Sequence, residues 1–135
     1  MTISLKDRLA MYEAVIQMYG FVDSSDTEGF AKCFTQNADF VAPFGEYTGR
    51  RELQEMLEEQ IAAGKEDGVR HFVSNLVVDS EGDNPRIQWH VLKMKVDTGP
   101  TVLATAVGTA IGEKTNGTIL FKQFRLEVGE ASIPH

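Results

Sequence analysis

The sequence has few of the features that mark secreted, membrane-spanning or nucleic-acid-binding proteins. Cys33 is the only cysteine among 135 residues, so no disulfide can form within the chain. Lys and Arg number 13 against 20 Asp and Glu, and the resulting net charge of −7 disfavours binding to the phosphates of nucleic acid. No apolar run approaches the roughly 18 residues of a membrane span, and the first residues do not have the pattern of a signal peptide. We therefore expect a cytoplasmic protein that binds neither nucleic acid nor membrane.

Motifs of cofactor-dependent and nucleophilic enzymes are also missing. The chain contains no Gly-rich dinucleotide loop, no phosphate loop and no Gly-x-Ser-x-Gly elbow. Cys33 lies in an apolar stretch beside Phe34 with no base nearby, which is typical of a small core residue. Two His and a carboxylate, here His71, His90 and Asp23, form a known metal triad, but no short-range ligand spacing supports it. The sequence therefore predicts neither a metal nor a cofactor.

The composition is that of one globular domain. Hydrophobic residues make up 42 % of the chain, and 8 Phe, 3 Tyr and 1 Trp argue against disorder. No repeat, low-complexity tract or linker divides the chain. We expect a single domain over residues 1–135, with a core from about 4 to 128 and a loose tail at 129–135.

The first half of the sequence has helical periodicity. Ser4 can cap a helix that presents an apolar stripe at spacings of 4, 3, 4 and 3, formed by Leu5, Leu9, Tyr12, Ile16 and Tyr19. A second stripe beside it consists of Met11, Val15, Met18 and Val22. Together the stripes predict a helix covered on most sides. A capping box at residues 25–28 opens a second helix that reaches about residue 37. A short strand at 40–44, a turn at 45–49 and a third helix at 50–63 follow.

The second half has the period of two that is typical of strands. Four long strands are predicted at 69–79, 86–97, 101–113 and 118–128, and Asn116-Gly117 indicates a hairpin between the last two. Helices followed by an antiparallel meander indicate an α+β fold. We expect the strands to curl around the first helix and leave a pocket. On the second strand, Ile87, Trp89 and Val91 are expected to point outward as an apolar patch that favours self-association.

Two residues stand out as candidates for chemistry. Asp23 follows Tyr19 by four residues and so lies in register with the first apolar stripe, although it could equally belong to a turn at 23–26. Alternation on the first long strand puts His71 and Asn75 on one largely apolar face, together with Val73 and Val77. A buried His needs hydrogen-bond partners, and a satisfied structural His is the alternative to a catalytic one.

Weaker candidates are polar side chains that could reach the same pocket. His90 alternates with Gln88, Leu92, Met94 and Val96 and is expected to point inward. Tyr47 lies on a loop that could reach the pocket mouth. Tyr12 and Tyr19 share the stripe of Asp23 and could donate hydroxyl groups to a ligand. For each of these residues plain packing is the alternative.

Four segments in order resemble the SnoaL-like branch of the nuclear-transport-factor-two-like superfamily. They are residues 21–26 (FVDSSD), 33–40 (CFTQNADF), 47–50 (YTGR) and 70–75 (RHFVSN), within a match that runs from about residue 5 to 128. The pattern is most similar to the scytalone dehydratase and hexachlorocyclohexane dehydrochlorinase group. That resemblance implies a cone-shaped α+β barrel, in which three N-terminal helices pack on a strongly curved antiparallel sheet that encloses a pocket.

The resemblance also implies a site. Asp23 and His71 match the buried Asp–His dyad of the group, and Asn75 matches a recurring Asn. The sequence departs from the group where the dehydrochlorinase has a Lys, here Met18, and where the family often has Gly-Trp, here Gly117-Thr118. Scytalone dehydratase has a second active-site His on the next strand, and the nearest candidate for it in this sequence is His90. These departures argue against either exact substrate and leave the dyad intact.

The function implied is that of a cofactor-independent lyase of the dehydratase type, or an isomerase or polyketide-cyclase-like enzyme. Its substrate would be a small hydrophobic cyclic molecule, and the enzyme would be a homodimer or homotrimer. The alternative is a domain of the same fold that binds a small ligand or another subunit without catalysis.

Overall fold

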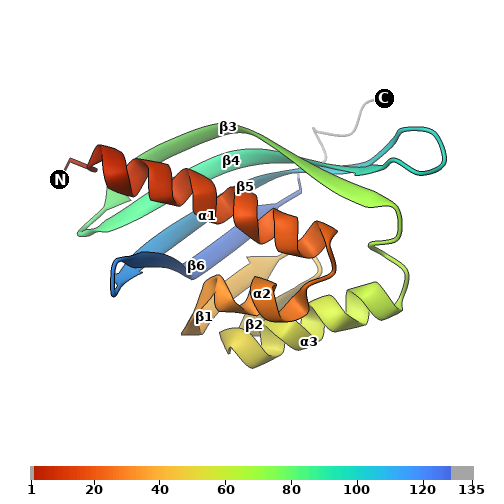
Figure 1. Cartoon of the computed structure of the whole chain (residues 1–135), viewed down its shortest axis with the longest axis horizontal. Helices are drawn as coiled ribbons and strands as arrows, with labels where there is room; N and C mark the ends of the chain where they lie inside the picture. The colour runs from red at the N-terminus through yellow and green to blue at the C-terminus, as the bar shows by residue number, and fades with distance from the viewer. Residues whose placement is uncertain (1, 129–135) are drawn as a thin grey trace.

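The structure is a computed structural model that describes residues 2–128, in which three helices and six strands are formed (Figure 1). The helices are α1 (Leu5–Asp23), α2 (Thr27–Lys32) and α3 (Gly49–Ala62). The strands are β1 (Phe34–Ala42), β2 (Gly45–Thr48), β3 (Val69–Glu81), β4 (Asn84–Lys95), β5 (Thr101–Thr115) and β6 (Thr118–Glu127). The tail predicted at 129–135 lies outside the described residues. None of the described helices combines the length and the apolar character needed to cross a membrane.

All six strands form one mixed sheet in the order β2-β1-β6-β5-β4-β3. The meander from β3 to β6 is antiparallel, as predicted, but β1 runs parallel to β6. The expectation of a wholly antiparallel sheet is therefore wrong at that pair. Hairpins force antiparallel pairing, whereas β1 and β6 are separated by most of the chain and no hairpin constrains them. The α+β class is confirmed.

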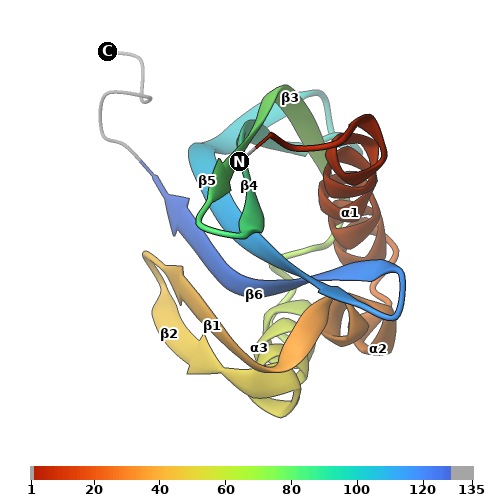
Figure 2. The same ribbon diagram turned by 90° about the vertical axis from the view of Figure 1, so that its left-hand side faces the viewer.

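The helices lie on one side of the sheet (Figure 2). Helix α1 contacts β3, β4 and β6, while α3 contacts β1 and β2. Between them and the sheet lies the core, whose largest fully buried side chains are Trp89, Phe34, Phe121, Met11, Met18, Leu53, Leu57, Ile87 and Val15. The strong curvature expected of the sheet stays a prediction.

Helix α1 begins as predicted, with the Ser4 hydroxyl accepting a hydrogen bond from the Asp7 backbone N–H at 3.1 Å. The face that it buries differs from the expectation. Leu5, Leu9 and Ile16 of the first stripe are 81 %, 54 % and 53 % exposed. The buried residues are those of the second stripe together with Tyr19, namely Met11, Val15, Met18, Tyr19 and Val22. Both stripes have helical spacing, so only the direction in which α1 crosses the sheet decides which one is covered.

The second helix is shorter than predicted. It ends at Lys32, and Phe34 already belongs to β1, where it pairs with Phe121 of β6. Its N-cap is Asp26, whose side chain accepts a hydrogen bond from the Gly29 N–H at 2.9 Å. Packing of the Phe34 ring against aromatic rings of the sheet overrides the local helical pattern.

Two strands present faces other than those predicted. A bulge between Ser74 and Val77 of β3, with Asn75 at φ +56°, reverses the alternation, so Asn75 and Val77 are exposed while His71 remains on the inner face. Thus His71 and Asn75 do not share a face.

On β4 the inward and outward sets are exchanged. Ile87, Trp89 and Val91, expected outside, are buried, and His90 is exposed on the other face. Trp89 lies opposite Gly108 of β5, where a Cβ atom would come within 2.1 Å of the indole ring. The missing side chain of Gly108 makes the room that allows the largest residue of the chain to face the core.

Candidate functional site

Asp23 and His71 meet where the end of α1 passes the start of β3. Asp23 Oδ1 lies 2.7 Å from the ring Nδ1 of His71, and Asp23 Oδ2 accepts the His71 backbone N–H at 3.0 Å. The side chain of Asp23 is 18 % exposed and that of His71 is 10 % exposed. One carboxylate therefore holds both the backbone and the ring of His71, which fixes the position and the plane of the imidazole.

This contact determines which ring nitrogen is available for chemistry. An ionised carboxylate only accepts hydrogen bonds, so Nδ1 of His71 carries the proton that it donates to Asp23. In the neutral ring, Nε2 then has the free lone pair. The carboxylate also stabilises the imidazolium that forms when Nε2 takes up a proton. The arrangement is suited to a general base.

A second side chain of α1 supports the imidazole from its face. Tyr19, one helical turn before Asp23, stacks on the His71 ring with a centroid distance of 5.1 Å and an interplanar angle of 27°. The Trp89 Nε1–H donates to the Tyr19 hydroxyl oxygen at 3.1 Å. Burial raises the pKa of Tyr19 far above its ordinary value, so the phenol stays neutral. Trp89 and Tyr19 thus hold His71 without adding charge.

His71 lines a cavity of about 220 Å³ between the helices and the sheet. Its wall is mainly apolar and includes the side chains of Met18, Tyr19, Val22, Phe30, Phe40, Phe44, Met56, Leu57, Val91, Phe124 and Leu126. Pockets for drug-sized ligands measure roughly 300–1,000 Å³, so this cavity suits a smaller molecule of one or two rings.

An ion pair that sequence reasoning missed lies in the same wall. Lys93 pairs in register with His71 across β3 and β4, and its Nζ lies 3.1 Å from Oε2 of Glu66 in the segment before β3. Both residues line the cavity, as does Thr105. Lys93 could have been found from the sequence, because it alternates in phase with Trp89 and Val91, which a core-facing strand would bury. The alternation also fits the opposite phase, with His90 pointing inward, and that phase leaves Lys93 on the outer face.

The remaining predicted site residues lie apart from this cavity. Tyr12 is half-buried against the core and lies outside the described lining, as does Tyr47, whose ring packs on Phe40 and Phe44. Asn75 is on the exposed bulge, and His90 faces away from the dyad. Among residues 2–128, no group of three His, Cys, Asp or Glu side chains is arranged to hold a metal ion.

The SnoaL-like domain model matches residues 4–125. The chain belongs to the SnoaL-like domain family. The SnoaL-like chain is similar in structure to a protein of cystatin-like fold from Nostoc punctiforme, with 18 % identity, a TM-score of 0.86 and 97 % of each chain covered. An NTF2-like protein with a cystatin-like fold from Novosphingobium aromaticivorans shares 18 % identity over 95 % of this chain and 87 % of that one, with a TM-score of 0.84.

A third solved structure, from Catenulispora acidiphila in complex with S-DNPA, has 20 % identity and a TM-score of 0.75, with 89 % of this chain and 91 % of that one covered. A comparison with curated proteins finds no significant match to the SnoaL-like chain. At these identities the likeness shows the NTF2-like fold alone. It lends no specific support to the narrower resemblance to scytalone dehydratase and hexachlorocyclohexane dehydrochlorinase.

Proposed function

We propose that this protein is a cofactor-independent lyase of the dehydratase type, or an isomerase, that acts on a small hydrophobic cyclic molecule. The observation that carries the proposal is the pair of hydrogen bonds, at 2.7 and 3.0 Å, that His71 donates to Asp23 in the wall of a mainly apolar cavity. The solved relative in complex with S-DNPA supports ligand binding by proteins of this fold.

In the proposed reaction His71 Nε2 takes a proton from a carbon atom of the ligand. Asp23 balances the charge of the imidazolium, which then returns the proton to a leaving hydroxyl in a dehydration or to another carbon in an isomerisation. A positioned general base of this kind accelerates a reaction by roughly 10²–10⁴-fold. The apolar wall keeps bulk water away from the reacting atoms. This chemistry needs neither a metal nor an organic cofactor.

Proton abstraction from carbon can be tested before the natural substrate is known. 2-Tetralone is a two-ring ketone with acidic C–H bonds, and deuterium uptake from D₂O at these carbons is followed by NMR. We expect the wild-type protein to accelerate the exchange and His71→Ala to lose the acceleration. Equal acceleration by both proteins would contradict His71 as the base, whereas binding of 2-tetralone without exchange would favour the non-catalytic ligand-binding alternative.

A further inference from the structure

Three of the polar side chains that line the cavity lie close together: His71, Lys93 and Glu66. Lys93 of β4 is the cross-strand neighbour of His71 of β3, so the two side chains leave the sheet on the same face. Adjacent strands lie about 4.8 Å apart, so these positions are neighbours. Glu66 reaches this group through its ion pair with Lys93. The dyad and this second polar group therefore face the same space.

One oxygen atom of the second group, Oε1 of Glu66, is buried and has no hydrogen-bond partner among residues 2–128. The Glu66 side chain is only 5 % exposed, and the residue lines the cavity. Buried polar atoms in folded proteins are almost always hydrogen-bonded, because leaving them unpaired is costly. This oxygen therefore points to a ligand group that would pair with it.

We propose that the cavity takes a one- or two-ring molecule that carries a hydroxyl group, and that Glu66 Oε1 accepts the hydrogen bond of this hydroxyl. The inference rests on the proposed function in one respect, since both take this cavity as the ligand site. It adds a substrate class: a phenol, enol or ring alcohol.

The charges around Glu66 explain why a neutral donor fits better than a cation. Lys93 lies 3.1 Å from Oε2 and already balances the carboxylate. A cationic ligand would leave the site with an excess positive charge in apolar surroundings, which is unfavourable. A hydroxyl group satisfies Oε1 without adding charge, and its hydrogen bond to an ionised acceptor is stronger than one between neutral groups. It would also anchor the ring beside His71, the cross-strand neighbour of Lys93.

The test compares two probes that differ in one hydrogen-bond donor, 2-naphthol and 2-methoxynaphthalene, by equilibrium dialysis. We expect the wild-type protein to bind 2-naphthol at least about tenfold more tightly, as is typical of one hydrogen bond to a charged group. In Glu66→Gln the side-chain oxygen can turn to Lys93 and present its amide N–H₂ to the cavity, so the preference should fall to within about threefold.

Matched variants separate this effect from general damage. Glu59→Gln makes the same chemical change on the exposed face of α3, so it should keep the wild-type preference. His71→Ala should keep it too, because binding of the hydroxyl does not require the base. Loss of 2-tetralone exchange in that variant therefore reports on the proposed reaction, independently of the hydroxyl site.

Three results would overturn the hydroxyl site. The first is equal affinity of the wild-type protein for the two probes, which would mean that solvent satisfies Oε1 of Glu66. The second is a preference that is unchanged in Glu66→Gln. The third is failure of the wild-type protein to bind either probe.

Discussion

At the scale of single residues, His71 is held on three sides. Asp23 binds its backbone N–H and its ring, while Tyr19 stacks on its face. Because Asp23 and His71 act as one unit in the proposed reaction, we expect their substitutions to be non-additive. His71→Ala and Asp23→Asn should each lower turnover by about 10²–10⁴-fold, and the double variant should be little worse than the worse single one.

Turnover of 2-tetralone exchange by the wild-type protein and the three variants checks this prediction. His90→Ala is the control, because His90 is exposed on the opposite face of the sheet and should leave the rate unchanged. Losses that simply add in the double variant would mean that the two residues act separately.

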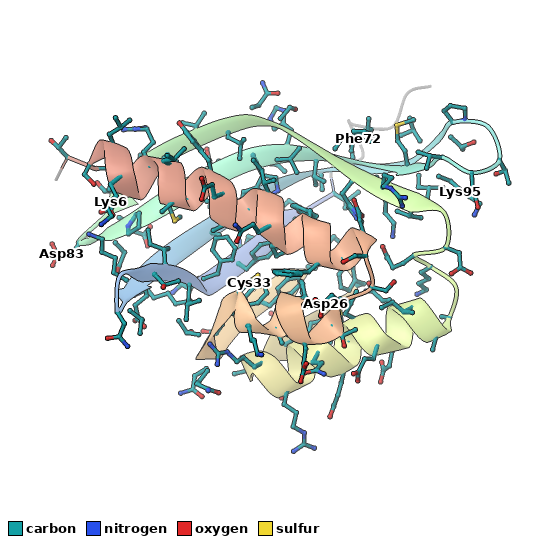
Figure 3. The ribbon with its side chains drawn as sticks, in the orientation of Figure 1. Lys6, Asp26, Cys33, Phe72, Asp83 and Lys95 are labelled. Carbon is teal, nitrogen blue, oxygen red and sulfur yellow. The ribbon has the colours of Figure 1, made fainter. Side chains whose placement is uncertain are left out.

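Cys33 offers a second test at this scale. Burial, together with the smaller effect of the nearby negative charge of Asp26, raises the pKa of its thiol to about 11. The neutral thiol therefore persists at pH 8, and the reactive thiolate forms only as the pH approaches 11. Figure 3 labels both residues, which flank α2: Asp26 comes just before the helix and Cys33 just after it. We expect iodoacetamide to react with Cys33 at least about tenfold more slowly in the native protein than in urea at pH 8.

Asp26→Asn provides the matched change for Cys33. An Asn side chain retains the N-cap of α2 but removes the charge, so the thiol pKa should fall and the native alkylation rate at pH 8 should rise. Native and denatured rates that are equal at pH 8 would contradict the raised pKa of Cys33.

At the scale of elements, the contact between β4 and β5 determines how the site is supported. A Cβ at Gly108 would overlap the Trp89 ring, which itself donates to Tyr19 behind His71. Gly108→Ala should therefore destabilise the fold by about 1–3 kcal/mol, as overpacking does. Urea unfolding measures this loss, and 2-tetralone exchange should fall with it because Tyr19 loses its partner.

Gly20→Ala is the control for this change of packing. Gly20 lies within α1 with no atom near its added Cβ, so alanine should raise stability by about 0.5–1 kcal/mol through helix propensity. If both glycine variants shifted stability in the same direction, steric overlap with Trp89 would not be the cause.

At the scale of the whole molecule, the outer face of the sheet remains the predicted surface for self-association. The side chains first expected there are buried, but other apolar residues take their place: Phe72, Val77 and Val107 are 51 %, 59 % and 43 % exposed. Phe72 projects from β3 on the side away from the helices (Figure 3). We expect light scattering to give two or three times the mass of one chain.

Phe72→Asp should convert the assembly to single chains, because a charge at a buried interface is costly. Leu9→Asp makes a similar change on the exposed side of α1 and serves as the control. A single-chain mass for the wild-type protein would refute the assembly, and dissociation by Leu9→Asp alone would move the interface to α1.

The sequence by itself predicts the elements where the evidence is local. The N-cap of α1, the helical spacing, the change of period near residue 69 and the Asn116-Gly117 hairpin all depend on neighbouring residues, and the structure bears them out. Asp23 and His71 were brought together by resemblance. Periodicity alone left each with a structural alternative, and their contact at 2.7 Å joins residues 48 positions apart.

What only the tertiary structure decided is which side of each element faces inward and which distant residues meet. The two stripes of α1 are equally helical, and the two faces of β4 are both partly apolar, so the pattern could not choose between them. The bulge at Asn75 and the space above Gly108 determine which faces point inward. The extra residue at the bulge exchanges the two faces of β3 beyond it, and the absence of a side chain at Gly108 leaves room for Trp89 on the inner face of β4. The Glu66–Lys93 pair follows from that choice. Lys93 lines the cavity because β4 turns Trp89 and Val91 to the core, and its partner comes from a separate segment that the sheet brings alongside.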